Sequence, residues 1–312
     1  MTGKKNVSLP CAVGSTSYID TVKNSYYVDK TLLIRDLIDG HAAVTLFTRP
    51  RRFGKTLAVD MLKVFFEKTD EDNSVYFQDK KIWDCGEFYR KQQGAYPVIY
   101  ITFKDVKFDN WKDSLEAIRL VIRDEYMRHD EILSWDGLDV VEKDYLDRMQ
   151  KGTLSNVEYT RALLNLSRML EKYHNKKIVV LMDEYDTPMQ ESYINGYWEE
   201  LVAVTRSMFN STFKTNPYLE RAIMTGITRV SKESIFSDLN NLVVITTTSN
   251  QYETAFGFTE KEVFEALDEQ GLSNEKEEVK TWYDGFSFGD KKDIYNPWSI
   301  INFLKFKSLQ TY

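Results

Sequence analysis

The chain has 312 residues, of which 42% are hydrophobic and 29% charged, a composition typical of a folded globular protein and not of a disordered chain. Its net charge of −7 gives no overall positive field toward nucleic acid or an acidic membrane, so either contact would need a local patch. The two cysteines lack metal-ligand spacing, and no apolar run resembles a secretion signal or a membrane span. We therefore expect a cytoplasmic protein without a membrane partner.

Short β-rich runs alternate with segments of helical periodicity along the chain. This alternation predicts an α/β fold with a mostly parallel five-stranded sheet and flanking helices. The run at residues 178–182 is apolar at every position, as expected for a parallel strand that is covered on both faces. The expected strands are residues 42–48, 98–103, 178–182, 219–225 and 242–246.

Helical periodicity follows Lys55 and recurs at residues 111–126, 159–173 and 198–209. We interpret these apolar stripes as core-facing. The segment of about residues 105–175 is helical in pattern almost throughout, which predicts a helical insertion in a core domain of residues 1–248.

No strand signal follows Thr248, so residues 249–312 are expected to form a small helical subdomain. Thr259 and Glu262 predict a capping box, and Ser273 is a candidate cap for the next helix. Asn296 before Pro297 predicts the start of a last helix.

A candidate phosphate-binding loop follows the first expected strand. Gly54, Lys55 and Thr56 open a helix directly after that strand, which is the context that a P-loop needs. A helix N-terminus offers free N–H groups and a partial positive charge to an anion. Gly54 would let the backbone approach phosphate, Lys55 would reach the β- and γ-phosphates, and the Thr56 hydroxyl would bind Mg²⁺.

The loop departs from the usual G-x-x-x-x-G-K-[ST] pattern, because Arg49 stands where that pattern has its first glycine. Arg51 and Arg52 could add positive charge to the site or pair with an acidic group. The alternative to a phosphate site is an ordinary β–α turn with a basic solvated rim.

Carboxylates follow the all-apolar strand at 178–182. In open α/β sheets ligands bind at the carboxyl ends of the strands. Asp183 would hold the hydration shell of Mg²⁺, and Glu184 would orient or deprotonate the attacking water. Asp186 is a further candidate for the metal or for pairing a loop arginine. The alternative is a strand end that simply turns polar.

The fourth expected strand ends in polar residues too. Thr225 is a candidate sensor of the γ-phosphate. Arg229 could stabilise charge in its own site or across a subunit boundary in an oligomer, or it could be a solvated surface residue.

Taken in chain order, these motifs resemble the bacterial AAA-ATPase-like family. The resemblance rests on YYVDKT at 26–31, RPRRFGKT at 49–56, LMDEYD at 181–186, TGI at 225–227, WYDGF at 282–286 and YNP at 295–297. It implies that ATP and Mg²⁺ are the cofactors, that Asp183 and Glu184 are the acidic pair, and that residues 26–31 lie near the nucleotide. The nucleotide-binding residues that it implies are Arg52, Phe53, Gly54, Lys55 and Thr56. Arg51 and Leu57, which flank them, are further candidates for contact with the nucleotide.

Members of that family commonly carry a C-terminal PD-(D/E)XK nuclease-like domain, which we expect after Tyr312. None of it lies within these residues, so we transfer no nuclease activity to them.

Two functions stay open at this point. One is an ATPase that acts as a motor or switch for an attached or partner domain, with the residues after 250 as a lid. The other is a nucleotide-dependent binding or scaffold module with little hydrolysis, which Arg49 and Pro50 in the loop would fit. A third interpretation, direct handling of DNA or RNA, is weakened by the acidic total charge.

Overall fold

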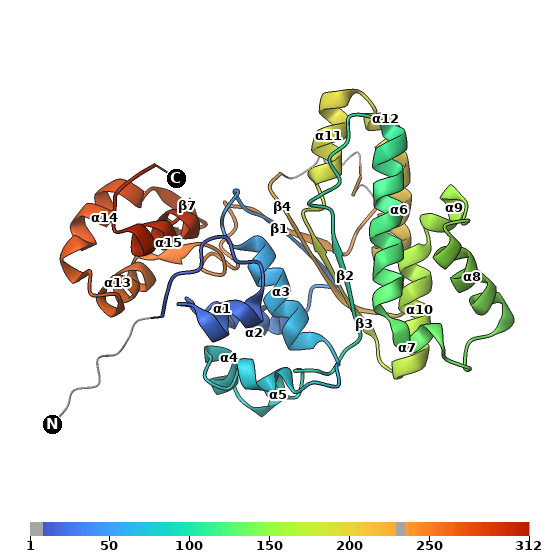
Figure 1. Cartoon of the computed structure of the whole chain (residues 1–312), viewed down its shortest axis with the longest axis horizontal. Helices are drawn as coiled ribbons and strands as arrows, with labels where there is room; N and C mark the ends of the chain where they lie inside the picture. The colour runs from blue at the N-terminus through green and yellow to red at the C-terminus, as the bar shows by residue number, and fades with distance from the viewer. Residues whose placement is uncertain (1–8, 229–234, 237, 312) are drawn as a thin grey trace.

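The computed structural model describes residues 9–228, 235, 236 and 238–311. A five-stranded parallel sheet in the order β2-β3-β4-β1-β5 lies at its centre (Figure 1). The strands are β1 (Val44–Thr48), β2 (Val98–Thr102), β3 (Ile178–Asp183), β4 (Leu219–Gly226) and β5 (Leu242–Ile245). The α/β fold and the five strands expected from the sequence are confirmed, with small shifts at the strand ends.

Both faces of the sheet are buried along β1 and β3. In β3 the side chains of Ile178, Val180 and Met182 belong to one apolar core, and those of Val179 and Leu181 to a second core on the opposite face. Parallel strands need such cover on both sides, which explains why the sequence of β3 does not alternate with polar residues.

Helices supply this cover in two layers (Figure 1). The first layer holds α1 (Tyr18–Asn24), α2 (Leu32–Asp39) and α3 (Lys55–Phe66), and the second holds α6 (Trp111–Arg128), α10 (Ala162–His174) and α12 (Trp198–Phe209). The remaining elements before β5 are η1 (Asn73–Tyr76), α4 (Lys81–Asp84), α5 (Glu87–Arg90), α7 (Asp130–Leu133), α8 (Val140–Lys151), α9 (Asn156–Tyr159), α11 (Thr187–Asn195) and the π-helical turn η2 (Asn210–Lys214). The segment between β2 and β3 contains helices α6 to α10 and no strand, as its pattern predicts.

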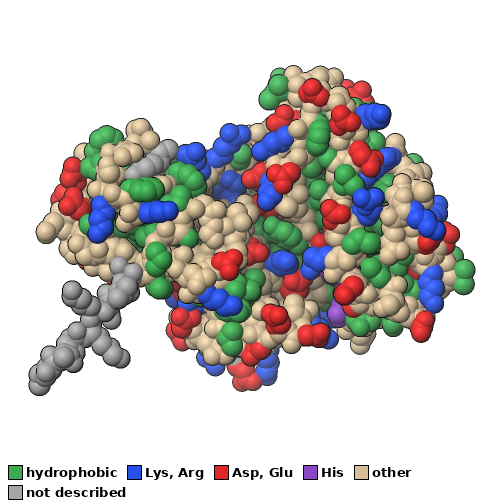
Figure 2. All heavy atoms as spheres, viewed as in Figure 1, with side chains coloured by type: hydrophobic (Ala, Val, Ile, Leu, Met, Phe, Trp, Pro, Cys, Tyr) green, Lys and Arg blue, Asp and Glu red, His purple; other side chains and the backbone are tan. Residues whose placement is uncertain are grey.

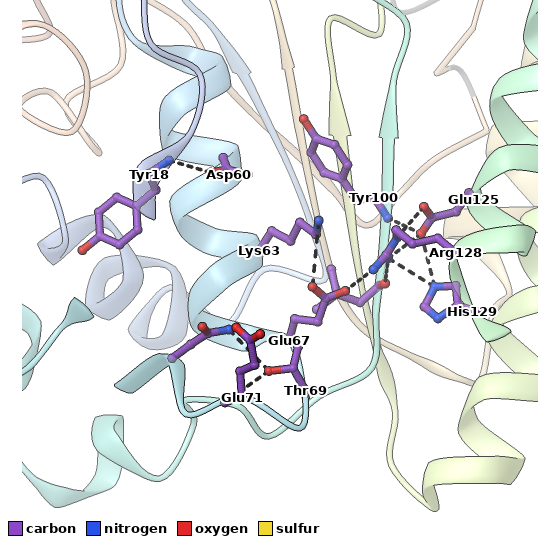
Figure 3. Close-up of polar contacts among 12 residues, drawn as sticks. Tyr18, Asp60, Lys63, Glu67, Thr69, Glu71, Tyr100, Glu125, Arg128 and His129 are labelled. Carbon is purple, nitrogen blue, oxygen red and sulfur yellow. Dashed lines mark hydrogen bonds and ion pairs between the residues drawn. The ribbon is translucent and has the colours of Figure 1, made fainter. Parts of the chain in front are cut away.

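Side chains from α6 and its C-terminal end cover the open edge of β2 (Figure 3). Glu125 accepts a 2.7 Å hydrogen bond from the backbone N–H of Tyr100, and Arg128 donates to the carbonyl of Val98. His129 lies 3.3 Å from the same Glu125 carboxylate. An edge strand with unpaired backbone groups invites pairing with another chain, so this cluster closes the edge.

The residues after Thr248 are not wholly helical, which corrects the expectation from the sequence. They contain a three-stranded antiparallel sheet in the order β6-β8-β7, built from β6 (Phe258–Thr259), β7 (Phe286–Phe288) and β8 (Lys291–Tyr295). These strands are short, and β7 and β8 each have exposed residues, so neither gives the long apolar run that marks a buried strand.

Three helices accompany this small sheet: α13 (Glu260–Glu269), α14 (Lys276–Tyr283) and α15 (Pro297–Phe306). The capping box of Thr259 and Glu262 is confirmed, and Asn296 caps α15 as predicted. Ser273 is not a cap, because it starts the turn η3 (Ser273–Glu275) that leads into α14. We call residues 249–311 the C-terminal subdomain.

Among the described residues, no helix is at once long and apolar enough to cross a lipid bilayer.

Candidate nucleotide-binding site

Strands β1, β4 and β3 end at the same edge of the sheet. Thr48 pairs with Gly226, and Met182 pairs with Met224, so the residues after all three strands converge. Because β4 lies between β1 and β3, Thr225 stands between the phosphate-loop strand and the strand that ends in Asp183.

Residues 49–54 form the loop that joins β1 to α3. Gly54 is the N-cap of α3 and has a φ of 77°. A Cβ at this position would meet nothing within 4 Å, so the left-handed backbone, and not crowding, favours glycine here. Arg52 adopts a φ of 68° in the same loop. These two positive φ angles curl the loop around the start of the helix.

The ammonium group of Lys55 lies inside this curl. Its Nζ atom donates hydrogen bonds of 3.0 Å to the carbonyl of Arg49 and 2.8 Å to that of Pro50. The side chain is buried, which lowers the pKa of Lys55, while the carboxylates that follow β3 act in the opposite direction. The lysine charge therefore faces both the loop backbone and the acidic group predicted from the sequence.

Asp183 is completely buried between two hydroxyl groups. Its Oδ2 accepts a 2.7 Å hydrogen bond from Thr56, and its Oδ1 accepts one from Thr225. Mg²⁺ usually keeps several waters and takes only one or two protein oxygens together with phosphate oxygens. A hydroxyl beside a carboxylate fits that preference, so the residues present are suited to the ion.

Within the described part of the chain, no group of three or more His, Cys, Asp or Glu residues could hold a metal by itself. A magnesium ion at Thr56 and Asp183 would therefore depend on the phosphate oxygens of a nucleotide.

Glu184 has a φ of 50°, which is uncommon for a residue other than glycine. Its carboxylate accepts a 3.1 Å hydrogen bond from the Thr187 hydroxyl, and its side chain lines the cavity described below. Unusual backbone angles of this kind concentrate at functional sites.

Asp186 does not pair with a loop arginine, which corrects that prediction. Its Oδ2 accepts hydrogen bonds from the backbone N–H groups of Ile227 (2.9 Å) and Thr228 (2.8 Å), so it holds the turn after β4. The guanidinium of Arg52 instead lies 4.7 Å from the ring of Trp298. Arg229, the candidate charge-stabilising residue, lies outside the described residues.

A cavity of about 620 Å³ adjoins the loop, within the usual range for small-molecule sites. Arg51, Arg52, Phe53, Gly54, Lys55, Thr56 and Leu57 all line it, and so does Glu184. The segment at residues 26–31, which the family resemblance places near the nucleotide, also lines the cavity, through Tyr26, Tyr27, Val28 and Lys30.

The C-terminal subdomain, which the sequence led us to expect as a lid, forms a wall of this cavity. It contributes residues 255–258 together with Pro297, Trp298 and Ile301. Among these wall residues the sequence singled out only Pro297, in the YNP motif at 295–297, and it assigned that residue no role at the site. Lys30 fixes this wall to the N-terminal segment through a 2.6 Å ion pair with Glu262.

Comparison with known proteins gives a family and one relative. The family model described as "Predicted AAA-ATPase" matches residues 12–236. A curated protein of Azotobacter chroococcum mcd 1, titled "Uncharacterized protein in vnfD 5'region", is 26% identical over 306 residues. The match covers 97% of this chain but 53% of the relative, so the chain spans about half the relative's length. No solved structure matches the chain.

Proposed function

We propose, since the chain belongs to the AAA-ATPase-like family, that it binds ATP with Mg²⁺ and hydrolyses it. The observation that carries the proposal is the meeting of Lys55, Thr56 and Asp183 at one edge of the sheet, beside a cavity of suitable size. Lys55, Thr56 and Glu184 line the cavity, and the buried Asp183 lies behind Thr56. A cation, a hydroxyl and carboxylates placed in this way are the parts that phosphoryl transfer requires, because its catalysis consists mainly of positioning and charge stabilisation.

Each residue of the site has a distinct role in this proposal. The backbone N–H groups at the start of α3 and the ammonium of Lys55 bind the phosphates. Thr56 holds Mg²⁺ and Asp183 orients Thr56 and the hydration shell, so that the bound ion offsets the phosphate charge. Glu184 orients the attacking water and accepts its proton.

Thr225 has the role of a sensor, because its hydroxyl shares the Asp183 carboxylate with Thr56. If the Thr56 hydroxyl bound Mg²⁺, its hydrogen bond to Asp183 would change. The hydrogen bond between Asp183 and Thr225, at the end of β4, would then change as well.

The apolar part of the cavity suits the base of the nucleotide. Tyr27, Val28 and Met61 line it, and the C-terminal subdomain adds Phe258 and Ile301. Flat heterocycles gain from contact with apolar and aromatic side chains, with a few polar groups to fix their orientation.

We further propose that the C-terminal subdomain acts as a lid and that the module serves as a motor or switch for a further domain or partner. The support is its direct contribution to the cavity wall, since a lid must touch the ligand whose state it transmits. A nuclease-like domain after Tyr312 remains our expectation from the family resemblance.

The test measures ATP binding to the purified protein by calorimetry, with and without Mg²⁺, and then the release of phosphate. Binding together with release supports an ATPase. Binding without release identifies the alternative, a nucleotide-dependent binding or scaffold module. No binding at millimolar ATP refutes the proposal.

Direct handling of nucleic acid has less support. On the face shown in Figure 2, Lys and Arg side chains are mixed with Asp and Glu over most of the surface, in keeping with the net charge of −7. Whether the chain binds nucleic acid directly is tested by measuring phosphate release with and without DNA and by a filter-binding assay at two salt concentrations. Tight, salt-sensitive retention of DNA would reverse the judgement.

A further inference from the structure

Arg49 occupies the place of the missing first glycine, and its side chain is completely buried. Its Nη1 donates to the carbonyls of Thr48 (3.0 Å) and Ile245 (3.3 Å), and its Nη2 donates to that of Tyr252 (3.4 Å). The guanidinium therefore joins the end of β1 to the end of β5 and to the first residues of the C-terminal subdomain.

The charge of Arg49 has no ion pair with any described carboxylate. Two aromatic rings of the C-terminal subdomain lie beside the charge where a carboxylate would otherwise be expected. The guanidinium carbon is 4.8 Å from the ring centre of Phe288 and 5.6 Å from that of Phe256. Burial lowers the pKa of Arg49 to about 10, which leaves the group cationic at neutral pH. A buried charge is costly unless its surroundings compensate it, so this cation holds its carbonyl and ring partners in one arrangement.

The backbone of the same residue reaches the nucleotide site. The Arg49 carbonyl accepts a hydrogen bond from Lys55, and the Arg49 N–H donates a 3.1 Å bond to the carbonyl of Gly226, beside Thr225. One residue thus contacts the lysine of the phosphate loop through its main chain and the C-terminal subdomain through its side chain.

Phe53 of the same loop strengthens this connection. Its ring lies 4.9 Å from Phe286 and 5.3 Å from Phe288, and Gly257 approaches it so closely that an added Cβ would lie 3.2 Å from the ring. The phosphate loop and the β7–β8 hairpin are therefore packed together directly, without an intervening layer.

We propose that Arg49 is a positioning residue that couples the phosphate loop to the C-terminal subdomain. When a phosphate replaces the Arg49 carbonyl as the partner of Lys55, the loop backbone moves, and the guanidinium passes that movement to the β7–β8 hairpin. The glycine of the usual loop pattern has no side chain to do this. The inference rests on the proposed nucleotide binding and adds a mechanical role for the residue that departs from the pattern.

The test is hydrogen–deuterium exchange of the whole chain, with and without Mg²⁺ and a non-hydrolysable ATP analogue. In the wild type we expect slower exchange in residues 49–58 and also in residues 286–295. In Arg49→Met, which keeps a long apolar side chain but no charge or donor, we expect the loop response to remain and the hairpin response to fall to background.

Arg221→Met is the matched control. Arg221 also donates to a backbone carbonyl, that of Leu37 at 2.8 Å, and lies 5.7 Å from an aromatic ring, that of Phe66. It stands near the start of β4, at the opposite end of the sheet from the loop. We expect this control to keep the hairpin response of the wild type.

The outcomes separate this inference from the proposed function. A wild type that binds no analogue refutes the proposed function. Binding with no hairpin response in the wild type, or with an undiminished response in Arg49→Met, overturns the coupling role alone. If Arg49→Met does not fold, Arg49→Lys decides, because it keeps the charge and loses the planar fork: a weakened hairpin response supports the inference, and an unchanged one overturns it.

Discussion

The hydroxyl of Thr56 donates a 2.7 Å hydrogen bond to Asp183, across a sequence separation of 127 residues. This bond joins the first turn of α3 to the end of β3, with the end of β4 between them. It makes the phosphate loop and the acidic strand end one site, so substitutions in either segment have predictable effects on a shared ligand.

Lys55→Ala is expected to abolish ATP binding measured by calorimetry. The substitution removes the ammonium group that we propose binds the phosphates, and each hydrogen bond to a charged group contributes about 1.5–3 kcal/mol. The loss of one such bond lowers the affinity by roughly 10-fold or more, and the loss of two lowers it by roughly 100-fold or more. Lys63→Ala is the matched control, because Lys63 lies on the same helix but contacts Glu67 and Tyr100 and does not line the cavity. Wild-type affinity in Lys55→Ala would refute the assignment.

Glu184→Gln is expected to keep ATP binding and to lose phosphate release by roughly 100-fold or more, the usual effect of removing a general base. The amide preserves the size of the side chain but cannot accept the proton of the attacking water. Glu191→Gln serves as the control, because Glu191 lines the same cavity from α11. We expect its phosphate release to stay near the wild-type rate. Unchanged release in Glu184→Gln would remove Glu184 from the proposed role.

Asp183→Asn is expected to remove most of the effect of Mg²⁺ on ATP affinity. The neutral amide offers one acceptor oxygen where two hydroxyl donors, Thr56 and Thr225, now share a carboxylate. The measurement is calorimetry with Mg²⁺ and with a chelator in its place. If the ratio of the two affinities is as large as in the wild type, Asp183 has no part in binding the ion.

Asp186→Asn gives the control for that experiment. Asp186 is equally buried and lies three residues further on, but its Oδ2 holds the turn at Ile227 and Thr228. We expect it to lower the thermal midpoint of unfolding and to retain the effect of Mg²⁺.

The sheet and the central residues of the site could be predicted from the sequence because their signals are local. A wholly apolar run such as that of β3 indicates a strand covered on both faces. A glycine, a lysine and a threonine at the start of a helix after a strand indicate a phosphate site. Parallel pairing then brings the carboxyl ends of the strands to one edge, so the approach of Asp183 to Thr56 followed from the fold class.

Other features depend on partners that no local pattern reveals. Asp186 could not be assigned to the turn after β4, because its N–H donors, Ile227 and Thr228, lie about forty residues further along the chain. The strands β7 and β8 are short and partly exposed, so they lack the apolar signal of the central sheet. The role of Arg49 depends on ring contacts with Phe256 and Phe288, which lie more than two hundred residues away in the chain.

The stability of the chain is expected to depend on pH through His129, at the covered edge of β2 (Figure 3). His129 is buried and lies 3.0 Å from Glu131 and 3.3 Å from Glu125, with the guanidinium of Arg128 3.2 Å away. Burial by itself would lower the pKa of His129, but the hydrogen bonds to the two carboxylates outweigh burial and raise it above 6.5. A raised pKa in the folded state means that folding favours the protonated ring.

The stabilisation from this ring is therefore fully present below the unfolded-state pKa and is lost as the pH rises through the folded-state pKa. We expect His129→Gln to lower the free energy of unfolding by about 1–3 kcal/mol at about pH 6, with a smaller difference from the wild type at about pH 9. Urea unfolding followed by circular dichroism at several pH values measures this difference. His41→Gln is the control, since His41 is exposed and lies outside the cluster. A difference for His129→Gln that stays constant or grows with pH would show that the ring is not held in its protonated form.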